Sequence, residues 1–288
     1  MTTARLSAPP VAAVVGWPVD HARSPAIHNH WLRTLGIQGR YERIGVAPDD
    51  APKFFANLRD RNLVGCNVTV PHKEIALTAA HDVTPIARKV GAANTLWFEG
   101  SRLCATNTDV EGFIRNLDQQ APAWRKKDRP AIVLGAGGAA RGIIFGLLEA
   151  GVEQILLTNR TAERADVVAR DFGPKVIATP WLPDRAQFGE AGLVVNTTTL
   201  GMKAAATVGP PIDVSLLRDD ATVADAVYIP LMTPLLKAAA SRGLATVDGL
   251  GMLLHQAVTP FEKFFGQRPT VTKDLYDLLV KDLEREQP

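Results

Sequence analysis

A glycine-rich turn between a strand and a helix constrains this chain more than any other segment. Residues 131–134 (Ala-Ile-Val-Leu) form an apolar run without alternation, which is typical of a strand covered on both faces. The turn Gly135-Ala136-Gly137-Gly138-Ala139-Ala140 follows, and residues 139–150 favour a helix that ends at Gly151. A second strand is expected at residues 154–158. This G-x-G-x-x-A pattern in its strand–turn–helix–strand context predicts a dinucleotide-binding βαβ unit.

The small residues of the turn each have a use in such a unit. Glycine at positions 135 and 137 permits a sharp turn and a close approach to a pyrophosphate, and the small Ala140 lets the helix pack against the strand. The helix N-terminus then offers N–H groups and a positive dipole end to the phosphates. The alternative is a turn that binds no ligand. The loop residues expected to bind the cofactor are Gly135, Ala136, Gly137, Gly138 and Ala139.

The end of the second strand indicates which dinucleotide binds. A site for NAD usually carries Asp or Glu there, which bonds the ribose 2′-hydroxyl. This chain has Asn159, Arg160 and Thr161 instead, followed by Arg164. Guanidinium groups attract the 2′-phosphate of NADP, whereas a carboxylate repels it. We therefore predict an NADP(H) site. The alternative is that both arginines are solvated surface charges.

Short apolar runs alternate with helical stretches over the rest of the chain. Such alternation predicts βαβ units and a parallel sheet in an α/β fold. The first helix is expected at residues 25–35, with Ser24 as its N-cap and Pro25 at its first position. The other expected strands are residues 11–15, 41–46, 65–70, 192–196, 222–227 and 244–247, with a hairpin at 95–98 and 102–105.

Two loops follow expected strands at the edge where open α/β sheets bind their ligands. They are residues 196–202 (Asn-Thr-Thr-Thr-Leu-Gly-Met) and residues 225–228 (Asp-Ala-Val-Tyr). For the threonines that begin at Thr197, contact with the cofactor and local capping of a helix are equally good interpretations.

A lysine in a tight polar setting is the strongest catalytic candidate. Lys73 ends the run Asn67-Val68-Thr69-Val70-Pro71-His72-Lys73, and Asp109 follows 36 residues later in Asn107-Thr108-Asp109. Hydride transfer to a ketone leaves an alkoxide unless a general acid delivers a proton, and an ammonium can do so while it stabilises negative charge. The alternatives are a surface lysine at a helix start and, for Asp109, the N-cap of a helix that begins at Val110.

Together and in this order, the motifs resemble the shikimate dehydrogenase family over about residues 11–267. The resemblance rests on residues 16–18, 24–29, 65–73, 91–95, 107–109, 135–140, 159–161, 225–228 and 249–257. It implies an NADP-dependent enzyme that reduces 3-dehydroshikimate to shikimate in chorismate and aromatic amino-acid biosynthesis. It also implies an α/β substrate domain at residues 1–110, a doubly wound Rossmann domain at 111–249, and a helical segment at 250–288 that packs back on the first domain. The active site would lie in the interdomain cleft.

The same resemblance implies roles for particular residues. Lys73 and Asp109 would be the catalytic pair. The residues that would hold the substrate are Ser24, Asn67, Thr69, Asn94, Tyr228 and Gln256, together with Asp109. The residues that would hold the cofactor outside the glycine turn are Asn159, Arg160, Thr161, Arg164, Thr197, Gly249 and Met252. Met252 and Gln256 stand four residues apart, so they share one helix face.

One position departs from the family pattern. The family usually has His-Ser-x-Ser-Pro, and this chain has His21-Ala22-Arg23-Ser24-Pro25, so one serine hydroxyl is missing. Loss of its hydrogen bond to the substrate carboxylate costs on the order of 1–3 kcal/mol of binding free energy if the carboxylate oxygen stays unpaired. Either water or Arg23 compensates, or the substrate is quinate or an amino-shikimate analogue. A silent NADP-binding sensor is a further alternative, although a sensor needs no proton donor.

Composition excludes several other classes of protein. A net charge of +2 over 288 residues gives no case for a nucleic-acid or membrane partner. Cys66 and Cys104 form no C-x-x-C pair and join no zinc-spaced set, so we expect two reduced thiols and no metal. Residues 1–10 are polar, and no apolar run approaches about 18 residues, so neither a signal peptide nor a membrane span is expected. The expected protein is a cytoplasmic monomer or homodimer that binds a small molecule.

Overall fold

The computed structural model describes residues 9–126, 128–181, 183–202 and 209–285. These residues form two compact units. The first comprises Met1–Thr108 and Ala257–Leu279, and the second comprises Asp109–Gln256 and Val280–Pro288. The expectation that residues 1–10 form no signal peptide concerns mostly residues 1–8, which lie outside the described residues.

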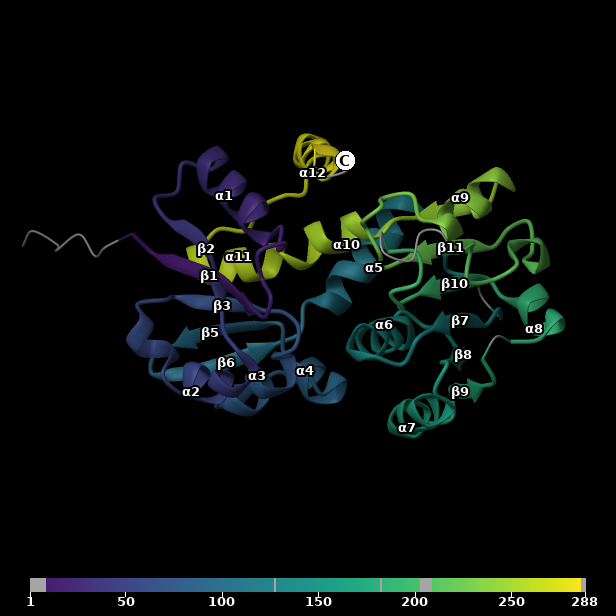
Figure 1. The fold of residues 1–288 in the computed structure, drawn as a ribbon, viewed down its shortest axis with the longest axis horizontal. Helices are drawn as coiled ribbons and strands as arrows, with labels where there is room; N and C mark the ends of the chain where they lie inside the picture. Colours follow the sequence, from purple (N-terminus) through teal and green to yellow (C-terminus); the bar gives the residue numbers. More distant parts are fainter. Residues whose placement is uncertain (1–8, 127, 182, 203–208, 286–288) are drawn as a thin grey trace, which may run out of the picture. The chain divides into compact units, whose positions relative to one another are not determined.

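A six-stranded mixed sheet forms the centre of the first unit (Figure 1). Its order is β2-β1-β3-β5-β6-β4, and β5 runs antiparallel to both of its neighbours. The predicted hairpin is confirmed, because β5 and β6 pair from Thr95 opposite Thr106 to Glu99 opposite Arg102. The strands are β1 (Val11–Gly16), β2 (Arg40–Gly45), β3 (Gly65–Val68), β4 (Asp82–Val83), β5 (Thr95–Glu99) and β6 (Arg102–Thr106).

Helices cover both faces of this sheet. Alternate residues of β1 point to opposite sides, so Ala13 and Val15 join a core with Phe54 and Phe55 of α2, while Val14 packs on the other side with Tyr41 and Phe264. The helices are α1 (Ser24–Thr34), α2 (Ala51–Ala56), α3 (Lys73–Ala79), α4 (Pro85–Val90) and α11 (Val258–Phe265). Helix α12 (Lys273–Arg285) begins in this unit, and its residues from Val280 on belong to the second.

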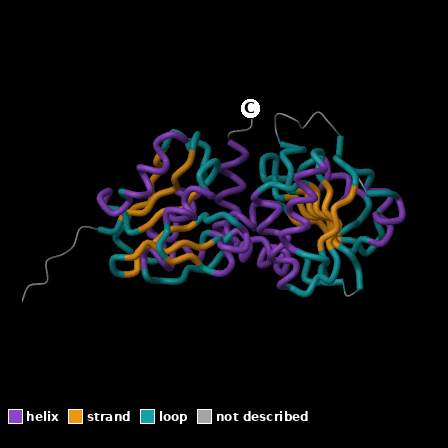
Figure 2. Tube along the Cα trace, turned by 90° about the horizontal axis from the view of Figure 1, so that it is seen from below, coloured by secondary structure: helices purple, strands orange, loops and turns teal. Residues whose placement is uncertain are grey.

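The second unit contains the doubly wound parallel sheet that the glycine turn predicts. Its order is β12-β11-β10-β7-β8-β9, so the chain winds outward in both directions from β7. The strands of this sheet, orange in Figure 2, lie together with helices around them. The four-residue β9 was not expected from the sequence. The strands are β7 (Ala131–Leu134), β8 (Ile155–Thr158), β9 (Val176–Thr179), β10 (Leu193–Asn196), β11 (Thr222–Asp225) and β12 (Ala245–Val247).

Two apolar layers hold the helices of the second unit on its sheet. One layer joins Val133 and Val195 to Phe113, Ile143 and Val168 from three helices. The other contains residues of α8 and α9. Helices α5 and α10 pack side by side (Figure 1). The helices are α5 (Asp109–Gln120), α6 (Gly138–Glu149), α7 (Ala162–Phe172), α8 (Arg185–Glu190), α9 (Pro234–Ser241) and α10 (Gly249–Gln256).

Membrane spans and metal clusters are both absent from the part of the chain that the structure describes. Among its helices, no stretch combines the length and the hydropathy that a membrane span requires. The same residues contain no group of three or more His, Cys, Asp or Glu side chains placed to hold a metal ion.

Candidate active site

A buried chain of hydrogen bonds in the first unit contains two of the predicted substrate residues. Asn67 lies at 5% exposure on β3, and its Nδ2 donates to the Asn94 carbonyl at 3.2 Å and to Thr95 Oγ1 at 3.1 Å. Thr95 Oγ1 donates in turn to Asn94 Oδ1 at 2.9 Å. The Thr108 backbone N–H also donates to Asn94 Oδ1, at 2.9 Å. Polar groups this deeply buried are stable because each has a partner, so Asn67 and Asn94 are held in one fixed arrangement.

The network extends to Ser24 through a residue that sequence reasoning missed. Tyr41 on β2 is 3% exposed, and its hydroxyl donates to Asn67 Oδ1 at 2.7 Å. The Ser24 hydroxyl bonds the same phenol. Burial raises the pKa of Tyr41 well above its usual value, so the phenol keeps its proton and acts as a donor. In the sequence, Tyr41 is recognisable only as an apolar position of an expected strand. Such positions are typical of an ordinary hydrophobic core, so they do not indicate a functional residue.

The prediction that Ser24 caps α1 is wrong. Arg23 is the residue before the helix, and its backbone already has right-handed helical angles (φ −93°, ψ −9°). Ser24 therefore lies inside α1 rather than at its cap position. Its hydroxyl instead bonds Tyr41, which places it in the polar network.

Lys73 and Thr69 lie on either side of the turn between β3 and α3. The Thr69 N–H donates to the Val15 carbonyl at 2.8 Å and continues the strand pairing. Lys73 is the first residue of α3 and is half-buried, and its carbonyl accepts from the Ala93 N–H at 2.9 Å. This bond ties the lysine to the segment that leads into Asn94.

The neighbouring histidine is held in another environment. His72 is fully buried, and its Nε2 lies 2.7 Å from the Val46 carbonyl. Its ring meets Phe55 edge-on in the apolar layer on one face of the sheet. We therefore assign His72 a structural role and no part in the polar network.

Asp109 and Gln256 are brought close to one helix crossing in the second unit. Helix α5 begins at Asp109 itself, rather than at Val110 with Asp109 as its cap. At Gly112 the helices are so close that a Cβ would lie 2.7 Å from the Cβ of Gln256 and 2.8 Å from the Met252 carbonyl. Met252 and Gln256 therefore share the face of α10 that meets α5.

The start of α10 lies against the loop that carries Tyr228. A Cβ on Gly249 would come within 2.5 Å of the Ala226 carbonyl oxygen and 2.8 Å of the Val227 carbonyl oxygen. Only glycine fits against that backbone. This close contact ties Gly249 to the residues immediately before Tyr228.

The glycine turn has the geometry of a phosphate-binding loop. Gly135 has φ +104°, a conformation that favours glycine, and a Cβ there would lie 2.6 Å from Thr197 Oγ1. A Cβ on Gly137 or Gly138 would meet no described atom within 4 Å, so the N-terminus of α6 faces open space. Ala140 is fully buried, as close packing of α6 on the sheet requires. The loop thus fits the pyrophosphate of a dinucleotide.

Three polar side chains follow β8: Asn159 is held by hydrogen bonds, whereas Arg160 and Arg164 are exposed. Asn159 Oδ1 accepts from the Ala136 N–H at 3.2 Å, and its Nδ2 donates to the Thr161 carbonyl at 2.8 Å. Asn159 therefore joins the glycine turn to the start of α7. Arg160 and Arg164 are exposed, which leaves their guanidinium groups accessible to an anion.

The loops after β10 and β11 are held by a buried carboxylate. Asp225 accepts hydrogen bonds from Asn196 Nδ2 at 2.9 Å, the Val227 N–H at 3.0 Å and Thr233 Oγ1 at 2.7 Å. Burial nonetheless raises the pKa of Asp225 to about 6, against the effect of these three donors. Thr197 Oγ1 donates to the Leu134 carbonyl at the end of β7, at 2.7 Å, and this bond is not a helix cap. The contact of Thr197 with the cofactor stays a prediction.

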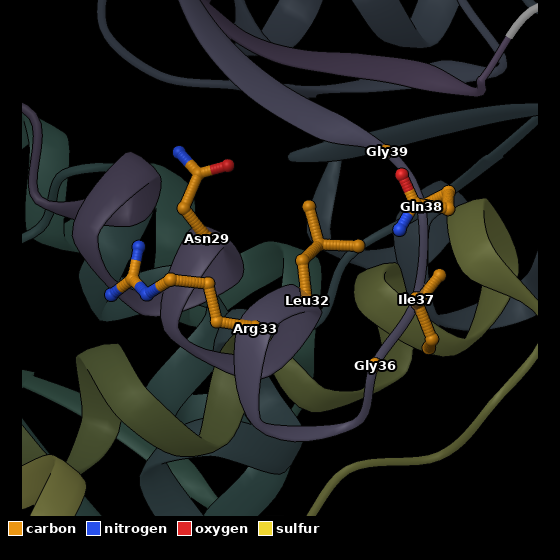
Figure 3. Close-up of a pocket in the computed structure, with 7 residues that line it drawn as sticks. All are labelled: Asn29, Leu32, Arg33, Gly36, Ile37, Gln38 and Gly39. Carbon is orange, nitrogen blue, oxygen red and sulfur yellow. The ribbon is translucent and has the colours of Figure 1, made fainter.

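A pocket of about 300 Å³ has none of the predicted substrate residues in its lining (Figure 3). Asn29, Leu32 and Arg33 of α1 line it together with residues 36–39. Asn29 connects it with the network, since its amide pairs with the backbone of Tyr41. We assign no substrate role to this pocket.

Comparison with known proteins adds the family context. Residues 14–96 match the model of the shikimate dehydrogenase substrate binding domain, and residues 118–199 match that of shikimate / quinate 5-dehydrogenase. A relative from Azorhizobium caulinodans, named shikimate dehydrogenase (NADP(+)), is 52% identical over 94% of this chain and 96% of its own length.

Two solved structures extend the comparison. Shikimate 5-dehydrogenase from Thermus thermophilus, in complex with NADP(H) and shikimate, has a TM-score of 0.83 at 34% identity and covers 95% of this chain and 99% of its own. Quinate dehydrogenase from Corynebacterium glutamicum, in complex with NAD, has a TM-score of 0.86 at 29% identity, with coverage of 94% and 99%.

Proposed function

The chain belongs to the shikimate dehydrogenase family, and on that premise we propose that it catalyses the reversible, NADP-dependent reduction of 3-dehydroshikimate to shikimate. This reaction serves the biosynthesis of chorismate and the aromatic amino acids. The observation that carries the proposal is the buried network of Asn67 and Asn94, because it fixes two amide groups next to the segments that adjoin Lys73.

The residues of the first unit would bind the substrate. Ser24 and the other members of the site would together hold its carboxylate and hydroxyls. Thr69 belongs to this group because it continues β3 beyond Asn67. From the second unit we assign Tyr228 and Gln256 to the same substrate, and Asp109 to both binding and catalysis. These assignments rest on the family pattern and on the helix crossing at Gly112.

Proton delivery is the chemistry that this chain must supply. NADPH, when bound, supplies the hydride. The ammonium of Lys73 would place a proton on the carbonyl oxygen as negative charge develops there, and Asp109 would orient that ammonium. In the oxidative direction Lys73 would take the proton back from the alcohol.

Cofactor binding falls to the second unit. The open N-terminus of α6 would receive the pyrophosphate, and Asn159, Thr161 and both exposed arginines would surround the 2′-phosphate. Thr197, Gly249 and Met252 would border the nicotinamide end. We assign residues 1–110 with 250–288 to substrate binding and 111–249 to nucleotide binding.

Two further properties belong to the proposal. Cys66 and Cys104 are both free thiols, which suits a reducing compartment, and we place the enzyme in the cytoplasm. We propose that it acts as a monomer or a homodimer.

The deciding experiment follows NADP⁺ reduction at 340 nm with shikimate, beside parallel reactions with quinate and with NAD⁺. Strong turnover that requires both shikimate and NADP⁺ supports the proposal. Turnover with quinate alone retains the mechanism and changes the substrate, in line with the missing hydroxyl at Ala22 and with the quinate dehydrogenase fold. Ala22→Ser should then lower the KM for shikimate. Cofactor binding without any turnover identifies a sensor.

A further inference from the structure

Tyr41 hydrogen-bonds two residues of the proposed substrate network, Ser24 and Asn67. Its phenol contacts the Ser24 hydroxyl on α1 and the Asn67 amide on β3. We propose that Tyr41 is a positioning residue, which holds Ser24 and Asn67 in the arrangement that binds the carboxylate and hydroxyls of the substrate. This inference rests on the proposed function.

Helix α1 directs three contacts onto this tyrosine. Ser24 bonds its hydroxyl, His28 stacks on its ring with centroids 4.0 Å apart and planes 12° apart, and Asn29 pairs with its backbone. The Asn29 contact is two-fold, since Oδ1 accepts from the Tyr41 N–H at 3.0 Å and Nδ2 donates to the Tyr41 carbonyl at 2.9 Å. Backbone, ring and hydroxyl are therefore all fixed from one helix.

The phenol also determines which way the Asn67 amide faces. A protonated phenol donates to Oδ1, so the Nδ2 group must face the Asn94 carbonyl and Thr95 Oγ1. Without the phenol, Oδ1 loses its buried donor, and only the two bonds of Nδ2 hold the amide in place. The direction of the Asn67 amide would decide whether it offers a donor or an acceptor to a substrate hydroxyl.

His28 contacts the Tyr41 ring at a cost in stability. The ring is fully buried, and neither nitrogen has a hydrogen-bond partner among the described residues. Burial lowers the pKa of His28 to about 3, so the ring is neutral. Buried polar atoms without partners are unfavourable, and a phenylalanine would pack among Trp31, Phe261 and Phe264 without that cost. The stacked imidazole instead fixes the plane of the Tyr41 ring.

The test compares Tyr41→Phe with the wild-type enzyme under steady-state conditions. The variant removes only the hydroxyl and retains the stacked ring. We expect the KM for shikimate to rise by about ten-fold or more, which is the effect of losing hydrogen bonds in a binding site. The kcat should change by less than about three-fold and the KM for NADP⁺ should stay unchanged, because Tyr41 is assigned to neither proton transfer nor nucleotide binding. Tyr276→Phe on α12 serves as the matched control and should leave all three constants unchanged.

A double-mutant cycle with Ser24→Ala separates positioning from general loss of structure. If Tyr41 acts partly through Ser24, Tyr41→Phe should raise KM by a smaller factor when Ser24 is already alanine. Purely structural damage would give the same factor in both backgrounds, and that result would overturn the proposal.

A second variant covers the case in which Tyr41→Phe does not fold. Asn29→Ala releases the backbone of Tyr41 and leaves its phenol, and it should raise the KM for shikimate by a smaller factor in the same direction. An unchanged KM in whichever of the two variants folds overturns the positioning role. Absence of shikimate turnover in the wild-type enzyme, by contrast, is a failure of the proposed function itself.

Discussion

Gly112 of α5 lies directly against Gln256 of α10, and a Cβ at position 112 would stand 2.7 Å from the Cβ of Gln256. The crossing is held at its other end by Asn116, whose Nδ2 donates to the Asp248 carbonyl at 2.6 Å. Asp109 begins the same α5. The two helices thus fix a proposed catalytic residue and a proposed substrate residue relative to each other.

Gly112→Ala should both loosen the second unit and weaken substrate binding. Real Cβ atoms do not approach this closely, and the opposing atoms include the backbone of α10, so the helices must separate. We expect a loss of about 1–3 kcal/mol in the free energy of unfolding, measured with urea, and a higher KM for shikimate. Gly189→Ala on α8 is the matched control, because its Cβ would meet only the Leu216 carbonyl at 3.9 Å, an ordinary contact. Equal stability of the two variants would contradict the tight crossing.

Asp225→Asn should change how stability depends on pH. The pKa of Asp225 is raised to about 6, above its unfolded value, so folding favours the protonated form. This contribution to stability is fully present below about pH 4 and is lost as the pH rises through 6. Asparagine does not titrate. The variant should therefore gain about 1 kcal/mol relative to wild type between about pH 5 and about pH 8, measured by urea unfolding at both values. A difference independent of pH would show that the carboxylate stays charged.

The sequence was sufficient where one local rule decides the structure. The unbroken apolar run at 131–134 becomes a central strand of a parallel sheet, and Gly135 takes the left-handed turn that its position requires. Strand β9 escaped prediction because it is a four-residue edge strand, in which Ile177 remains exposed. Its pairing with β8 comes from tertiary structure.

Predictions from local sequence were wrong or incomplete where a side chain bonds a residue that is distant in the sequence. Ser24 before a proline is a typical helix cap, but its hydroxyl bonds Tyr41 and the helix starts one residue earlier than expected. Tyr41 and Asn67 are 26 residues apart, and no spacing rule connects them. Asp225 begins the 225–228 motif, but its raised pKa results from burial, which the sequence pattern does not predict.

Replacing both Arg160 and Arg164 by alanine should abolish the preference for NADP⁺. Both side chains are exposed just after Asn159, which bonds the glycine turn, and charge-assisted bonds to a 2′-phosphate are worth roughly a factor of ten or more in affinity. The KM for NADP⁺ should rise accordingly, whereas that for NAD⁺, which lacks this phosphate, should change little. Arg170→Ala, in the last turn of α7, is the control and should leave both constants unchanged. Equal losses with the two cofactors would exclude a 2′-phosphate role.

Lys73→Ala should remove most of the turnover and leave binding nearly intact. Lys73 is half-buried at the first position of α3, and its backbone is fixed by the Ala93 N–H, so the substitution removes the ammonium without moving the helix. Loss of a general acid typically lowers kcat by about 10²–10⁴-fold, while a group that acts mainly in the transition state contributes little to KM. Initial rates over a range of shikimate concentrations separate the two constants. Lys53→Ala, on the exposed side of α2, controls for the loss of one positive charge. A kcat close to wild type in Lys73→Ala would assign proton transfer to another group.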